Sequence, residues 1–218
     1  MLQLKKGEKE RMKSYKQLFL EIANSTDYKK NWATGASWRY YIDEADRRVY
    51  VQFQETKTWQ DWIFNFIVIP VKLEIVKGIS IKVPMGNYLQ WKSVHKDIVS
   101  IVNPYFEKGY DIHVTGWSQG GVTAGLFGFA YPYAHTIMYG TPKFLKKQQD
   151  IETYDKTVDY INFLYPDDPI RDVVPDYYRP TKTISDGFVP DFPPVSLDDK
   201  HRIYGHATYK DFNGKEEF

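Results

Sequence analysis

The segment HVTGWSQGGVTAGL, residues 113–126, places a single serine between glycines. Residues 116–120 fit the pattern G-x-S-x-G, with Ser118 at its centre. In this pattern a strand reverses sharply into a helix, so the serine occupies a strained backbone position with its hydroxyl free to react. The backbone N–H of Gln119 would point into the same space, at the start of the helix. The pattern therefore predicts that Ser118 is the nucleophile of an acyl transfer, with Gln119 as an oxyanion donor.

Two other interpretations compete for the same turn. A phosphate-binding loop would need G-K-[ST] or G-x-G-x-x-G, and the turn offers neither of these patterns nor a neighbouring lysine. An ordinary strand-to-helix junction stays open until the partners of the serine are considered.

A serine nucleophile needs a general base, and five histidines are available. In α/β-hydrolases the chain order is serine, acid, histidine, which excludes the three early histidines: His95, His113 and His135. Of the other two, His206 lies in the segment YGHATY, whereas His201 lies in the charged run DDKHR, which is typical of a solvated surface. We therefore favour His206 as the base, with His201 as the alternative.

The base in turn needs a carboxylate that follows a strand behind the nucleophile helix. The apolar run Tyr160–Tyr165 predicts such a strand, and Pro-Asp-Asp-Pro follows it directly. Asp168 is the favoured acid, and both Asp172 and Asp167 remain within reach.

Composition removes several other classes of chemistry. The chain contains no cysteine, which excludes a thiol nucleophile, a disulfide framework and a Cys-ligated metal. With 29 Lys and Arg against 28 Asp and Glu, the net charge of +1 argues against nucleic acid as a partner. The serine mechanism needs no metal and no organic cofactor. The late aspartates are expected to be solvated rather than to hold a cation: Asp186, Asp191, Asp198 and Asp199.

The start of the sequence and its apolar runs indicate where in the cell we expect the protein to be. The start MLQLKKGEKERMK lacks the apolar core of a signal peptide. The most apolar run, residues 62–71, contains Asn65 and Pro70 and is too short to cross a bilayer. These features predict a cytoplasmic protein.

Hydrophobic periodicity indicates the elements that carry these residues. Helical spacing predicts helices over residues 8–23 and 121–130, and apolar alternation or short apolar runs predict strands over residues 38–42, 49–53, 66–71, 79–83, 111–115, 135–139 and 160–165. Strands that alternate with helices favour an α/β layer fold around a largely parallel sheet. At 218 residues, we expect one domain spanning residues 1–218.

Four segments in order resemble the class 3 lipases, the fungal-lipase-like family of α/β-hydrolases. They are VQFQET with its continuation KTWQDWIFNF (residues 51–66), HVTGWSQGGVTAGL (113–126), YGTP (139–142) and FLYPDDPIRDVVP (163–175). The match covers roughly residues 38–210. It implies the α/β-hydrolase fold, with a mostly parallel central sheet flanked by helices and a minimal cap.

The resemblance also implies roles that spacing alone does not show. Thr56 matches the residue that completes the family's oxyanion hole, together with the N–H of Gln119. The stretch 58–66 matches a mobile lid. We assign three tryptophans to the substrate pocket or the lid: Trp59, Trp62 and Trp117. A lipid ester and a transient lipid surface are the partners that this implies.

The chain departs from the family at several motif positions. Gln54-Glu55 replaces Arg-Gly before the oxyanion residue, Trp117 replaces a histidine, and Gln119 replaces a leucine. The leading prediction is a serine carboxylic-ester hydrolase for acyl-glycerol or other short-to-medium acyl esters. The alternatives are a phospholipid or monoacylglycerol hydrolase, or a non-catalytic lipid-binding scaffold if Glu55 disrupts the oxyanion loop.

Overall fold

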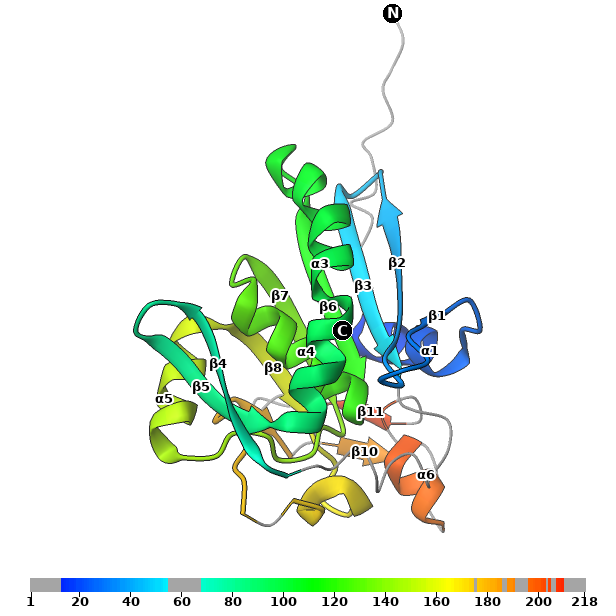
Figure 1. Cartoon of the computed structure of the whole chain (residues 1–218). Helices are drawn as coiled ribbons and strands as arrows, with labels where there is room; N and C mark the ends of the chain where they lie inside the picture. The colour runs from blue at the N-terminus through cyan, green and yellow to red at the C-terminus, as the bar shows by residue number, and fades with distance from the viewer. Residues whose placement is uncertain are drawn as a thin grey trace, which may run out of the picture.

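A computed structural model describes residues 13–54, 68–174, 176–185, 188–190, 196–202, 204 and 207–209 (Figure 1). The helices in these ranges are α1 (Tyr15–Asn24), α3 (Met85–Glu107), α4 (Gln119–Ala130), α5 (Gln148–Thr157) and α6 (Leu197–Arg202), with a 3-10 helix η1 (Pro169–Asp172). The strands are β1 (Lys29–Lys30), β2 (Ser37–Asp43), β3 (Arg48–Gln54), β4 (Pro70–Val76), β5 (Ile79–Pro84), β6 (Asp111–Trp117), β7 (Ala134–Tyr139), β8 (Asp159–Phe163), β9 (Thr183–Ile184), β10 (Phe188–Pro190) and β11 (Ala207–Tyr209).

The main sheet has the strand order β1-β2-β3-β6-β7-β8-β9. Strands β3, β6, β7, β8 and β9 run parallel, whereas β1 and β2 are antiparallel to their neighbours. The prediction of a mostly parallel sheet is confirmed. Because parallel strands end at the same side, β3, β6, β7 and β8 all finish at one edge, which we call the carboxyl edge; they begin at the amino edge.

Two helical layers cover the sheet, and the strand residues alternate between them. On one face α3 and α4 pack on an aliphatic core that includes Val49, Val51 and Val114. On the other face α1 covers an aromatic core that includes Tyr50 and Tyr139. Figure 1 shows α3 and α4 in front of the central strands. Each such side chain contributes about 1.5–3 kcal/mol on burial, so both layers hold the strands in place.

Helix α1 begins later than its apolar spacing predicts. Residues 13 and 14 are not helical, so the expected start at residue 8 is wrong for this part; residues 8–12 lie outside the described ranges. The side chain of Ser14 accepts a hydrogen bond from the N–H of Gln17 at 3.2 Å, and the Gln17 side chain accepts one from the Ser14 N–H at 2.8 Å. This capping box fixes the start of the helix and aims Leu18, Phe19 and Ile22 at the sheet.

One predicted strand also differs in its bounds. The run 66–71 becomes β4, which starts only at Pro70 and continues to Val76. It pairs with β5 in a separate two-stranded sheet rather than in the main sheet. Within the described ranges, no helix is both long and apolar enough to cross a bilayer.

Candidate active site

Ser118 occupies the sharp turn between β6 and α4. Its backbone has φ 57° and ψ −125°, a conformation that non-glycine residues rarely adopt. Its N–H donates to the Tyr139 carbonyl at 2.8 Å, and its own carbonyl accepts from the Gly121 N–H at 3.0 Å. Such a backbone costs about 1–3 kcal/mol and persists only where the surrounding structure enforces it. The strand–turn–helix geometry predicted for the G-x-S-x-G motif is confirmed.

The glycines around Ser118 are required by close packing against backbone and side-chain atoms. A Cβ on Gly116 would lie 2.2 Å from the Gly120 carbonyl oxygen, and one on Gly120 would lie 2.5 Å from the carbonyl oxygen of Phe53. A Cβ on Gly121 would lie 2.3 Å from Thr141 Oγ1. The first turn of α4 is therefore pressed against the ends of β6 and β3, and this contact holds the serine at the carboxyl edge.

The substitution Gly120→Ala is expected to lower the free energy of unfolding by about 3 kcal/mol or more, because the obstructing atoms are backbone and cannot move aside. Gly78→Ala is the matched control. Gly78 has φ 93° but nothing within 4 Å of a new Cβ, so only the backbone conformation costs energy, about 1 kcal/mol. Chemical denaturation measures both; equal losses would contradict the role assigned to packing at Gly120.

The hydroxyl of Ser118 is buried and makes no hydrogen bond to the residues that the structure describes. The residue is 0% exposed, and its Oγ has no hydrogen-bond partner in the described part of the chain. A buried hydroxyl without a partner is costly, so it points to a role in binding or chemistry rather than in stability. Gln119 follows as the first residue of α4 and is also buried. Its backbone N–H lies at the helix N-terminus, where the helix dipole favours negative charge.

Asp168 lies in the loop after β8 and is only 3% exposed. Its Oδ1 accepts the N–H of Ile170 at 2.9 Å, which caps η1. A Cβ on Gly140 would lie 2.7 Å from Asp168 Oδ2, so the carboxylate rests against the residue that follows β7. Ser118 follows β6 and Asp168 follows β8, and these two strands flank β7, so both residues lie at the carboxyl edge.

The alternative acids differ from Asp168 in their surroundings. The side chain of Asp167 is 63% exposed, and its nearest cation is Lys200 Nζ at 3.9 Å. The backbone of Asp172 closes η1, but its side chain lies outside what the structure describes. Of Asp168 and Asp167, only Asp168 is a buried carboxylate at the carboxyl edge.

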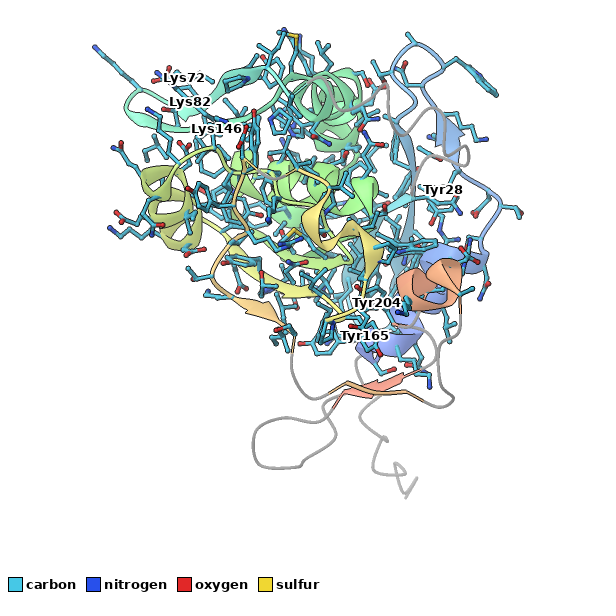
Figure 2. All side chains as sticks on the ribbon, turned by 90° about the horizontal axis from the view of Figure 1, so that it is seen from below. Tyr28, Lys72, Lys82, Lys146, Tyr165 and Tyr204 are labelled. Carbon is cyan, nitrogen blue, oxygen red and sulfur yellow. The ribbon has the colours of Figure 1, made fainter. Side chains whose placement is uncertain are left out.

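Tyr204 completes the surroundings of Asp168 and was missed by the sequence analysis. Its hydroxyl donates to Asp168 Oδ2 at 2.5 Å and accepts from the N–H of Tyr165 at 3.1 Å. Figure 2 shows Tyr204 and Tyr165 close together beside α6. Burial, reinforced by the charge of Asp168, raises the pKa of Tyr204 well above its usual value, so the phenol stays protonated and donates. The one sequence signal is its place two residues before His206.

Several predicted site residues lie outside the described ranges: Thr56, Trp59, Trp62, the stretch 58–66 and His206. The side chain of His201 also lies outside them. Trp117 requires a correction. It was assigned to the substrate pocket or lid, but it is 1% exposed and packs edge-on against Phe19, with ring centroids 5.3 Å apart. Its ring points toward α1 and packs in the aromatic core, and from there it supports the turn that carries Ser118. Among the described side chains, no three histidines or carboxylates lie together as a metal site.

Comparison with known proteins identifies the fold through structure alone. No protein-family model matches the sequence, and no curated protein matches it. Among solved structures, Rhizomucor miehei triacylglyceride lipase matches with a TM-score of 0.61 at 19% identity, covering 68% of this chain and 60% of that one. The lipase of Rhizopus microsporus var. chinensis matches with a TM-score of 0.60 at 21% identity, covering 68% and 55%. A variant of MDLA from Penicillium cyclopium gives 0.60 at 20% identity, covering 80% and 67%.

These likenesses confirm the predicted fold. The chain has the α/β-hydrolase fold in the form found in fungal lipases, as the resemblance of its motifs implied. It spans 50–60% of the length of the Rhizomucor miehei lipase chains that it matches. At about one residue in five identical, the likeness concerns the fold, and the activity has to be argued from the site.

Proposed function

We propose that this protein is a serine carboxylic-ester hydrolase with Ser118 as its nucleophile. The observation that carries the proposal is Ser118 itself: its hydroxyl is fully buried with no partner among the residues that the structure describes, and it is held at φ 57° where a strand turns into a helix. Stability alone gives no reason for either feature. A similar structure, at 20% identity, is reported as a triacylglycerol lipase whose catalytic centre is a serine protease triad.

In the proposed mechanism, Ser118 Oγ attacks the ester carbonyl carbon while His206 removes its proton. His206 then passes that proton to the leaving alcohol as the carbon–oxygen bond breaks. Asp168 fixes the imidazole tautomer and stabilises the imidazolium. Water attacks the acyl-enzyme with the same proton transfers in reverse. The Ile170 N–H and the Tyr204 hydroxyl each donate a hydrogen bond to the Asp168 carboxylate and so hold its orientation.

We assign the stabilisation of the negatively charged oxygen of the tetrahedral intermediate to the backbone N–H of Gln119 and to Thr56. The last residues of β3 support this assignment, because a Cβ on Gly120 would lie 2.5 Å from the Phe53 carbonyl oxygen and 2.8 Å from that of Gln54. The chain therefore leaves β3 directly beside the nucleophile turn, and Thr56 follows Gln54 by two residues. Each such donor is worth about a hundredfold or more in rate.

Substrate access needs an opening of the site, since Ser118 is 0% exposed. We assign this opening to the stretch 58–66, which matches the lid of the family. A lipid or detergent surface would stabilise the open form if apolar side chains become exposed in it. Hydrolysis should then rise steeply once an ester such as tributyrin exceeds its solubility.

Reaction with a fluorophosphonate probe tests the proposal most directly. The probe should form one covalent adduct, and mass spectrometry should place it on Ser118. Ser100→Ala, at an exposed serine on α3, is the matched control and should be labelled like the wild type. The ratio of p-nitrophenyl butyrate to palmitate hydrolysis then places the substrate between short esters and lipids. Absence of labelling, together with absence of hydrolysis, would leave a non-catalytic scaffold as the better description.

Tyr204→Phe should lower kcat roughly tenfold with little change in KM, because it removes a hydrogen bond to the charged carboxylate and leaves the substrate contacts intact. Stability should fall by about 1–3 kcal/mol, since the Tyr165 N–H loses this acceptor. The control is Tyr139→Phe. Tyr139 is equally buried, but its hydroxyl donates to the Tyr15 carbonyl at 2.7 Å. It should lose stability without losing rate, and equal rate losses in both variants would contradict the role of Tyr204.

A further inference from the structure

A cavity of about 410 Å³ opens at the amino edge of the sheet, on the face that carries α1. Its volume is typical of sites that bind small molecules. It is lined by Leu18 and by residues of β3, β6, β7 and β8, among them Tyr50, His113 and Ile137. His113 precedes Ser118 by five residues on the extended strand β6, so the cavity is roughly 16 Å from the nucleophile. It is therefore separate from the proposed active site.

A row of rings crosses the sheet at this cavity. Tyr41, Tyr50, His113 and His135 occupy facing positions on β2, β3, β6 and β7, and the row ends at Asp159 on β8. Neighbouring ring centroids are 4.8, 5.1 and 5.2 Å apart. His135 Nδ1 bonds to the carboxylate of Asp159. The register thus concentrates polar side chains where a sheet face is usually apolar.

His113 is the unusual member of this row. It lies on β6, is only 6% exposed and lines the cavity, and in the described part of the chain its ring contacts the rings of Tyr50 and His135 but makes no hydrogen bond. Burial, and then the nearby His135, lowers the pKa of His113 to about 4. A neutral imidazole presents one acceptor and one donor. An imidazole held in the lining of a cavity is available to hydrogen-bond a molecule bound there.

The charges around the cavity decide what kind of molecule this is. Both cationic side chains already have carboxylate partners: Lys13 Nζ is 2.6 Å from Glu21, and Arg48 Nη1 is 2.5 Å from Asp46. The carboxylate of Asp111, by contrast, makes no ion pair or hydrogen bond with the residues that the structure describes. The charge left without a partner at the cavity is therefore negative.

We propose that this cavity binds a small organic amine in its protonated form. The ammonium group lies between the carboxylates of Asp111 and Asp159 and donates to a ring nitrogen of His113. The hydrocarbon or aromatic body of the amine packs against Leu18 and Tyr50. An anionic ligand would meet both carboxylates, and a neutral one would leave Asp111 unpaired. The site is independent of the ester hydrolysis proposed above.

Isothermal titration calorimetry with benzylamine tests this inference, with benzyl alcohol and benzoate as neutral and anionic probes that share the ring. Benzylamine should bind at one saturable site, at least about fivefold more tightly than either of the others. Asp111→Asn should weaken benzylamine binding roughly fivefold. His113→Phe keeps the ring row but removes the acceptor, and should weaken it as well. Asp97→Asn, at an exposed aspartate on α3, is the matched control and should change nothing.

The inference would fail if benzylamine showed no saturable binding. It would also fail if benzoate or benzyl alcohol bound as tightly as the amine, or if Asp111→Asn left the affinity for benzylamine unchanged. Asp111 lies at the exposed start of β6, so its substitution should leave thermal unfolding unchanged even if His113→Phe fails to fold. Ester hydrolysis should be the same in every variant of this cavity, which keeps the outcome separate from that of the active site.

Discussion

Ser118→Ala is expected to lower kcat for p-nitrophenyl butyrate by roughly 10⁵-fold or more, the loss seen when a triad nucleophile is removed. Binding and the oxyanion donors remain, so a small rate above that of water should persist. Stability should behave in the opposite way. Among the described residues the buried hydroxyl that it deletes has no hydrogen-bond partner, so the free energy of unfolding should change by less than about 1 kcal/mol. Rate assays and thermal unfolding of the same preparation measure both.

This pairing of lost activity with retained stability distinguishes a nucleophile from a structural serine. If Ser118 were only part of a tight junction, its replacement by alanine would change the rate by the few-fold that a packing change causes. Ser100→Ala, at an exposed position of α3, should leave both rate and stability unchanged. A Ser118→Ala protein with wild-type hydrolysis would place the reaction elsewhere in the molecule.

The nucleophile turn could be predicted from the sequence because the G-x-S-x-G pattern itself places glycines where close packing leaves no room for a side chain. Gly116, Gly120 and Gly121 each face an atom within 2.5 Å of a would-be Cβ, and only the absence of a side chain satisfies that packing. The central strands could also be predicted from the sequence. Val49, Val51 and Phe53 alternate with Tyr50 because the two faces of β3 meet different cores.

Contacts between distant segments could not be predicted in this way. Tyr204 reaches Asp168 across 36 residues, and nothing in the spacing of either residue indicates that pair. The row that joins Tyr50 to His113 and His135 depends on the register of three strands, which hydrophobic patterns leave open when polar residues interrupt them. The start of α1 differs from the prediction because apolar spacing extends to residues before Ser14, whereas the capping box of Ser14 and Gln17 begins the helix at Tyr15.

The choice between the two neighbouring aspartates of the candidate site also could not be made from the sequence. Asp167 and Asp168 are the same residue type and adjacent in the loop after β8, so the sequence offers only a preference between them. The fold separates them: Asp168 turns inward to cap η1 and meet Tyr204, whereas the side chain of Asp167 is 63% exposed. A pair of substitutions at these two positions therefore tests the proposed triad with nearly identical chemistry.

Asp168→Asn is expected to lower kcat by about 10⁴-fold, because asparagine keeps the size of the side chain but removes the charge that orients and stabilises the histidine. Asp167→Asn should change kcat less than about twofold, since exposed charges contribute little. Both proteins should remain folded by circular dichroism. Loss of rate in Asp167→Asn with normal rate in Asp168→Asn would assign the acid to the exposed neighbour. Normal rates in both would move it to Asp172 or remove the triad altogether.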